Sequence, residues 1–309
     1  MTHVAASRAL FIKLGEGGRW EKSSIQNGEI RFGYQEIPHH VCQAGDWDEA
    51  RRIESQHCSN PGALARHINQ VQQFYTADES VMWITFYAGK LWWCFAEPGV
   101  AGLQNNDKVR KVKGQWRDVS VEGKTLWKRE ISGKLLAVEK FRGTICHVSK
   151  FPYLLHKVNG TFEPHVEAAQ QAYISLQVAL IPIIKNLHEF DFEIFVDLIF
   201  RQSGWQRVGV SGGTEKDIDL DLISPATGDR IAVQVKSAAD ITVWRDYKSR
   251  LSELSGFSRL YFVSHTPALA LVQEANKGQE EKIVLWDAKE LASQALRSGL
   301  TGWLMDKAS

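Results

Sequence analysis

The sequence predicts an α/β domain in the C-terminal half of the chain and, before it, a mixed α+β domain rich in β-strands. Between residues 190 and 297, short apolar runs typical of strands alternate with stretches of helical periodicity. The run Ile231–Lys236 alternates strictly between apolar and polar residues, as a half-buried strand does. The N-terminal half instead holds most of the 11 tryptophans and has short strand-like runs between Gly-rich turns.

Composition bounds the class of protein. With 309 residues the chain has room for two domains, and 44% hydrophobic with 24% charged residues is ordinary for a globular protein. The formal net charge is +1, so any surface for nucleic acid must be local. The four cysteines form no CxxC pair and no run approaches the ~20 apolar residues of a membrane span, so we expect a cytoplasmic protein without membrane contact.

The N-terminal domain is expected over residues 1–158, followed by a helical linker over 159–188. Acidic residues after Asp46 favour a short helix, and Asn60-Pro61 is typical of the start of a longer one. The clearest hairpin joins Val81–Tyr87 to Leu91–Ala96. Further strands are predicted at Leu10–Leu14, Ile30–Tyr34, Arg110–Trp116, Thr125–Arg129 and Gly143–Val148.

The C-terminal domain is expected over residues 189–309. Helical periodicity covers Pro164–Leu187, with a possible break at Pro182, and then Phe190–Gln202. Helices and strands alternate afterwards, as in a sheet covered on both faces. The predicted elements are helices at Val243–Leu254, Pro267–Asn276 and Ala288–Arg297, and strands at Leu260–Val263 and Ile283–Leu285.

The chemistry gathers on a predicted hairpin of the C-terminal domain. Alternation places Asp217, Asp219 and Asp221 on one face of the first strand, and Gln234 with Lys236 on the face of the second strand away from the core. Carboxylates this close repel one another, so a divalent cation would neutralise them. The pattern predicts a metal site with a lysine beside it. Taken singly, each segment could also be an ordinary half-exposed strand without a site, and the acidic one could be an edge strand whose charges prevent aggregation.

This arrangement resembles the PD-(D/E)xK nuclease superfamily, and within it the Mrr-like restriction endonucleases. The second motif is Gln234-Val235-Lys236, with Gln where many members carry an acid, and the resemblance runs from about Phe192 to the C-terminus. It implies a restriction-endonuclease-like fold, with a central mixed sheet flanked by helices.

The resemblance also implies roles for these residues. Asp219 would be the principal metal ligand, with Asp221 as the alternative in register and Asp217 as a weaker third. Gln234 would ligate the metal or a metal-bound water, and Lys236 would orient or deprotonate the attacking water or stabilise the transition state. Glu193, on the preceding helix, would complete the shell through water. Oxygen ligands point to Mg²⁺, with Mn²⁺ as a substitute.

A basic, tryptophan-bearing stretch in the N-terminal domain suits contacts to phosphates and stacked bases. The residues predicted to bind nucleic acid are Lys108, Arg110, Lys111, Lys113, Trp116 and Arg117. The alternative is a solvated strand face over a tryptophan-rich core, because acids are interspersed.

Together these features predict a metal-dependent DNA endonuclease whose first domain recognises DNA. The resemblance implies a setting in prokaryotic restriction or antiphage defence, and by analogy an aromatic-rich domain before such a nuclease suggests recognition of a modified or flipped base. Cleavage of both strands predicts a homodimer. Two alternatives stay open: an inactive nucleic-acid-binding module of the same fold, and a nuclease acting on RNA. The intact Asp219, Gln234 and Lys236 favour activity.

Overall fold

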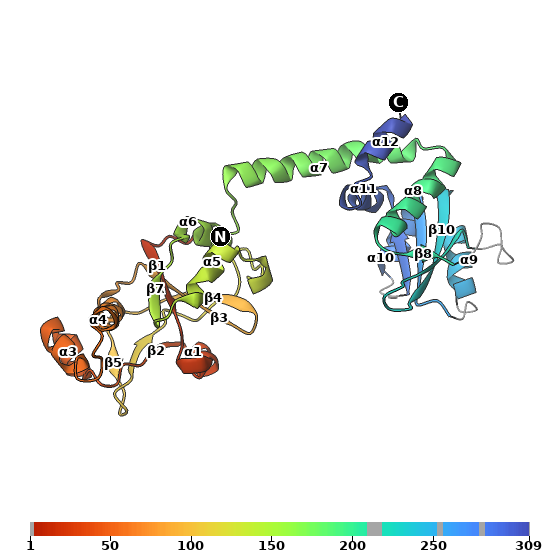
Figure 1. Cartoon of the computed structure of the whole chain (residues 1–309). Coiled ribbons are helices and arrows are strands. Elements are labelled where there is room, and N and C mark those ends of the chain that lie inside the picture. Colours follow the sequence, from red (N-terminus) through yellow and green to blue (C-terminus); the bar gives the residue numbers. More distant parts are fainter. Residues whose placement is uncertain (1–2, 209–217, 252–255, 278–281, 309) are drawn as a thin grey trace. The chain divides into compact units, whose positions relative to one another are not determined.

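The chain forms two compact units, Met1–Val166 and Glu167–Ser309, seen in the computed structural model of Figure 1. The structure describes residues 3–208, 218–251, 256–277 and 282–308. The division falls within the first turn of helix α7 (Pro164–Lys185), later than the boundary at residue 158 that the sequence suggested. That helix continues through Pro182 without a break and buries Leu180 and Ile184 in the core of the C-terminal unit.

The N-terminal unit contains two sheets. In the four-stranded sheet the order is β4-β3-β1-β7, and in the three-stranded sheet it is β2-β6-β5. The strands are β1 (Arg8–Ile12), β2 (Glu29–Phe32), β3 (Val81–Tyr87), β4 (Lys90–Phe95), β5 (Ala101–Gly102), β6 (Lys108–Lys111) and β7 (Ile145–His147). The α-helices are α1 (Glu21–Asn27), α2 (His39–Ala44), α3 (Trp47–Glu54), α4 (Pro61–Thr76), α5 (Gly133–Leu136) and α6 (Phe151–Asn159). Short 3-10 turns cover Glu16–Gly18, Lys128–Glu130 and Ala137–Lys140.

Local chemistry explains the N-terminal elements that the sequence predicted best. The side chain of Asp46 caps α3 by accepting from the Glu49 amide, and Asn60 caps α4 in the same way. The β3–β4 hairpin turns at Ala88 and Gly89, both with positive φ, as the favoured two-residue hairpin turn requires.

Two strand predictions in this unit were wrong. The segment from Thr125 to Arg129 makes only isolated bridges, at Thr125 and Trp127, and then enters a 3-10 turn. The strand expected from Arg110 to Trp116 is β6, which begins earlier, at Lys108, and ends at Lys111. Single bridges supply too few ladder hydrogen bonds to hold an extended strand.

The C-terminal unit is a five-stranded mixed sheet with the order β12-β11-β10-β9-β8. Strands β10, β11 and β12 are parallel, whereas β9 and β8 run antiparallel at one edge. The strands are β8 (Gln206–Arg207), β9 (Leu220–Ile223), β10 (Arg230–Ala239), β11 (Arg259–Pro267) and β12 (Ile283–Trp286). The helices after α7 are α8 (Glu189–Gln202), α9 (Ile241–Leu251), α10 (Leu269–Lys277), α11 (Ala288–Arg297) and α12 (Thr301–Ala308). This confirms the predicted mixed sheet flanked by helices.

Helices cover both faces of this sheet, so its central strands are apolar on both sides. Val233 and Val235 of β10 join a core with α8, where Phe195 and Ile199 are fully buried. On the other face Phe262 of β11 packs with Trp244 of α9.

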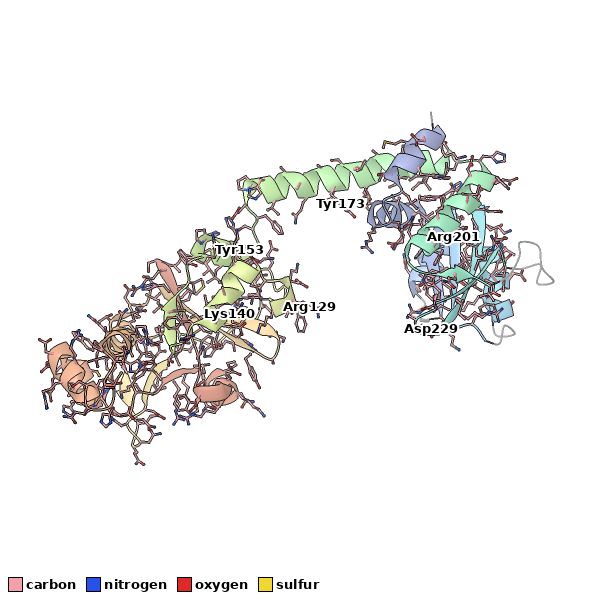
Figure 2. All side chains as sticks on the ribbon, in the orientation of Figure 1. Arg129, Lys140, Tyr153, Tyr173, Arg201 and Asp229 are labelled. Atoms are coloured by element: carbon pink, nitrogen blue, oxygen red, sulfur yellow. The ribbon has the colours of Figure 1, made fainter. Side chains whose placement is uncertain are left out.

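Two features of the C-terminal unit's helices were not predicted. The chain does not close with α11, because α12 follows it and stacks Trp303 on Phe195 at 5.9 Å. Helix α7 also leaves large apolar side chains exposed, among them Tyr173, labelled in Figure 2.

No helix in the described parts of the chain is long and apolar enough to cross a membrane. All four cysteines are free thiols, two of them buried.

Candidate active site

Strands β9 and β10 pair as the alternation predicted. Leu220 lies opposite Val233, and the ladder continues beyond β9, because the Asp219 amide donates to the Val233 carbonyl at 3.1 Å. Leu220 and Val233 are both buried in the core with α8. Asp219 therefore falls on the other face of the strand, the face of Gln234.

The side chains of Asp219 and Gln234 meet directly. Oδ2 of Asp219 accepts from Gln234 Nε2 at 2.7 Å and from the Val235 amide at 2.6 Å. An ionised carboxylate can only accept, so the group of Gln234 that points at Asp219 must be its NH₂. The orientation of the amide is thereby assigned by its partner.

This orientation leaves the amide oxygen of Gln234 without a partner. Gln234 is only 2% exposed, and none of the described residues donates a hydrogen bond to Oε1. The sequence predicted a side chain directed away from the core, but this face is covered too: Phe262, its neighbour in register, packs against α9. A buried oxygen without a donor costs about 1–3 kcal/mol, so a ligand that supplies a donor or a positive charge would stabilise this position.

Asp221, the alternative in register, is otherwise engaged. It lies opposite Ala232, and both of its carboxylate oxygens bind the guanidinium of Arg230, with Nε 2.8 Å from Oδ1. Asp221 is therefore held in an ion pair with Arg230, whereas Asp219 is held by a hydrogen bond from Gln234. Asp217 lies outside the described residues.

The pKa shifts of Asp219 and Glu193 show that these carboxyls and Lys236 lie close enough to interact electrostatically. Burial raises the pKa of the Asp219 carboxyl above its ordinary value, and the Val235 amide and the charge of Lys236 only partly oppose this. Partial loss of hydration also raises the pKa of Glu193 on α8, and the charge of Asp219 raises it further, while Lys236 lowers it. A buried carboxylate that hinders ionisation of a second one, with the charge of one lysine acting on both, is a charge pattern that suits a cation.

Arg207 of β8 belongs to the same cluster, and sequence reasoning missed it. Its Nη2 donates to the Asp219 carbonyl at 2.9 Å, and its charge lowers the pKa of both Asp219 and Glu193. Its strand has only two residues, too short for an alternation to be read.

The basic stretch of the N-terminal unit is largely internal, which corrects the predicted nucleic-acid surface at three of six residues. Lys108 and Arg110 are 0% and 2% exposed, and Trp116 is 4% exposed, with its indole NH donating to the Glu29 carbonyl at 3.0 Å. Lys111 and Lys113 are exposed, and the half-buried Arg117 lies over the Trp93 ring. Lys108, Arg110 and Trp116 therefore have no surface from which to touch a nucleic acid.

The residues at the candidate active site fit a hard cation. Asp219 supplies a carboxylate, Gln234 an amide oxygen for which the described ranges hold no donor, and Glu193 a second carboxylate nearby, all of them oxygen ligands of the kind Mg²⁺ takes. Within the described ranges no three His, Cys, Asp or Glu side chains group to hold a metal, so the amide oxygen would be an essential member of this set.

The C-terminal unit matches a known protein family. A protein-family model described as "Restriction endonuclease" matches residues 184–294. The solved structures that resemble the chain include the DNA modification-dependent restriction endonuclease AspBHI, with 12% identity and a TM-score of 0.34, over 78% of this chain and 74% of that one. A second is the MspJI restriction endonuclease in complex with a 27-mer oligonucleotide, with 11% identity and a TM-score of 0.30, over 79% and 68%.

A third is the restriction endonuclease FokI bound to DNA, with 12% identity and a TM-score of 0.28, over 67% of this chain and 38% of that one. None of the curated proteins matches the chain. With its mixed sheet, its flanking helices and this family match, the segment of residues 184–294 is an Mrr-like restriction endonuclease domain.

Proposed function

We propose that the chain is a Mg²⁺-dependent endodeoxyribonuclease that hydrolyses phosphodiester bonds, in a role in prokaryotic restriction or antiphage defence. The observation that carries the proposal is the buried oxygen of Gln234, which has no donor among the described residues and whose amide adjoins the carboxylate of Asp219. The family match over residues 184–294 supports the same class of reaction.

Asp219 and Gln234 would hold the ion, and Glu193 would complete its shell through water. Mg²⁺, or Mn²⁺ in its place, supplies charge neutralisation at the scissile phosphate and acidifies water when bound. Asp219 is the ligand in this assignment because Asp221 is committed to Arg230. The Val235 amide and Gln234 Nε2 fix the Asp219 carboxylate before any ion binds, so little reorganisation accompanies binding.

Lys236 supplies the remaining charge. By alternation it shares the face of Gln234, and its ammonium influences both carboxylates of the site. We assign its Nζ to the attacking water or to the charge that develops on the phosphate oxygens. Arg207, anchored on the Asp219 carbonyl, adds positive charge where a polyanion must approach.

The direct test incubates the purified full chain with plasmid, single-stranded DNA, RNA and DNA carrying modified bases, each with Mg²⁺ or with EDTA. We expect cleavage of double-stranded DNA that requires Mg²⁺. Cleavage of RNA alone would favour the ribonuclease alternative, and binding of DNA without cleavage of any substrate would favour the inactive binding module.

Two further parts of the proposal concern setting and assembly. Cleavage of both strands calls for two active sites, so we propose a homodimer on DNA, which light scattering with and without a DNA duplex measures. The free thiols agree with the reducing cytoplasm as the compartment.

A further inference from the structure

A cavity of about 580 Å³ opens in the N-terminal unit, well apart in sequence from the nuclease domain. Its size lies within the roughly 300–1,000 Å³ typical of sites for small organic ligands. The side chains that carry the argument are Lys13, Trp20, Tyr34, Glu54, His67 and Arg142. None of them was among the residues predicted to bind nucleic acid.

The cavity contains a buried carboxylate with one oxygen unused. Glu54, the last residue of α3, is 4% exposed, and its Oε1 lies 2.7 Å from Nδ1 of His67. Its Oε2 is buried and accepts no hydrogen bond within the described part of the chain. An acceptor this isolated is costly unless a ligand donates to it.

The surrounding charges narrow the class of ligand. Glu16 and Glu36 line the cavity together with Glu54, so a phosphate or carboxylate group seated in its inner part, beside Glu54, would be repelled. Lys13 and Arg142 line it as well, and they disfavour a cationic ligand. Although His57, His67 and Glu54 all contribute, no such trio among the described residues is placed to hold a metal. A neutral ligand with an N–H donor remains.

Aromatic side chains add a preference for a flat ligand. Trp20 and Tyr34 both line the cavity. Tyr34 stacks on Phe32 at 5.0 Å, and its hydroxyl accepts from Gln70 at 3.2 Å, so its ring is held in place. Its backbone has φ of 60°, a left-handed conformation that is uncommon outside glycine. Flat heteroaromatic rings that carry N–H donors and pack on aromatic side chains are the chemistry of nucleobases.

Arg142 and Lys13 are the cations that could meet the sugar-phosphate backbone of such a base. Arg142 is exposed, as are Glu16 and Glu36, and Lys13 is half-buried, whereas Glu54 is buried, so charges of both signs occupy the outer part of the cavity and the unused acceptor the inner part. A base turned out of a duplex enters a pocket in this order, with its edge inward and its phosphates at the rim.

We infer that this cavity binds a single nucleobase turned out of the base stack, one that carries an exocyclic amino group, and that the amino N–H donates to Glu54 Oε2. The inference rests on the proposed function, because it makes the N-terminal unit the reader of the DNA that the nuclease domain cuts. The contact is of the kind by which a carboxylate accepts from cytosine N4.

Fluorescence anisotropy of the full chain in EDTA tests the inference without cleavage. The probes are one labelled duplex in four forms: fully paired, with cytosine opposite an abasic site, with thymine opposite an abasic site, and with abasic residues in both strands. We expect the unpaired cytosine to bind about tenfold more tightly than the other three, the scale of one good base contact. Glu54→Gln and Trp20→Ala should reduce this preference to about twofold or less.

Trp127→Ala is the matched control, because Trp127 lines a different, smaller cavity of the same unit and its loss should leave the preference intact. Circular dichroism confirms that each variant is folded; if Glu54→Gln does not fold, Trp20→Ala decides alone. Equal binding of all four duplexes by the wild type would overturn the inference. So would a preference that survives in both folded cavity variants.

The same preparations are assayed for plasmid cleavage with Mg²⁺. Cleavage without a base preference would refute the cavity's role and leave the nuclease proposal standing. A base preference without cleavage would support the cavity's role and contradict the nuclease proposal.

Discussion

Strand β6 of the N-terminal unit and strand β10 of the C-terminal unit both bury polar side chains, but they satisfy them differently. On β6, Nζ of Lys108 donates to the carbonyls of Tyr34 and Ile37, the latter at 2.7 Å. Both terminal nitrogens of Arg110 donate to backbone carbonyls, and only its Nε lacks a partner within the described residues. On β10, the NH₂ of Gln234 donates to Asp219, and no donor among the described residues reaches its amide oxygen.

The difference teaches that burial alone does not separate structural from functional polar residues. Lys108 and Arg110 exchange water for carbonyl oxygens of the same chain, so their charges hold loops and helix ends together. Gln234 keeps an acceptor without a described donor, and Asp219 is a carboxylate whose pKa is raised by burial, so a cation would stabilise both. Glu54, with its unused oxygen, belongs with the second group.

The largest effect should appear when the site on β10 is broken. Asp219→Ala removes the charged ligand and Lys236→Ala removes the adjacent cation, so each should reduce plasmid cleavage by roughly 10³-fold. Asp229→Ala, in the exposed turn before β10, is the matched control and should cut at the wild-type rate. Full activity of Lys236→Ala would remove that residue from the mechanism.

The next effect concerns stability on β6. Lys108→Ala leaves two buried carbonyls without their donor, so we expect a loss of about 2–4 kcal/mol in unfolding free energy, measured by urea denaturation with tryptophan fluorescence. Lys111→Ala, on the same strand but exposed, should change stability by less than about 0.5 kcal/mol. Similar stability of the two variants would mean that Lys108 is not structural.

A smaller effect should follow pH. Because the pKa of Asp219 is raised in the folded protein, this group favours folding when protonated, and that contribution disappears as pH rises from its ordinary value of 3.8 through the raised pKa. In EDTA, Asp219→Asn should therefore gain stability relative to wild type as pH increases through this window. The difference in urea midpoint between Asp219→Asn and wild type is measured across pH 4 to 8. If the stability of Asp219→Asn relative to wild type fell as pH rose, the upward direction of the Asp219 pKa shift would be contradicted.

Much of this architecture follows from local sequence signals. The cap residues Asp46 and Asn60 start their helices where expected, and the alternation through Val233 and Val235 faces the core as predicted. These signals act within a few residues, so one sequence suffices to interpret them.

What the sequence could not show depends on distant segments. Whether the polar face of β6 or β10 meets water depends on the elements that cover it, so the burial of Lys108 and Gln234 was missed. The same holds for Arg207, which reaches Asp219 across a sheet edge, and for Glu54 and His67, which come from two helices. The choice between Asp219 and Asp221 needed the ion pair with Arg230.

The most direct measurement of the central claim is Mn²⁺ binding by calorimetry to the full chain, its Asp219→Ala variant and its Asp221→Ala variant. The wild type and Asp221→Ala should each bind one ion per chain at the candidate active site, and Asp219→Ala should lose that binding. Undiminished Mn²⁺ binding by Asp219→Ala, or its loss only in Asp221→Ala, would contradict the claim that Gln234 and Asp219 form a prepared cation site.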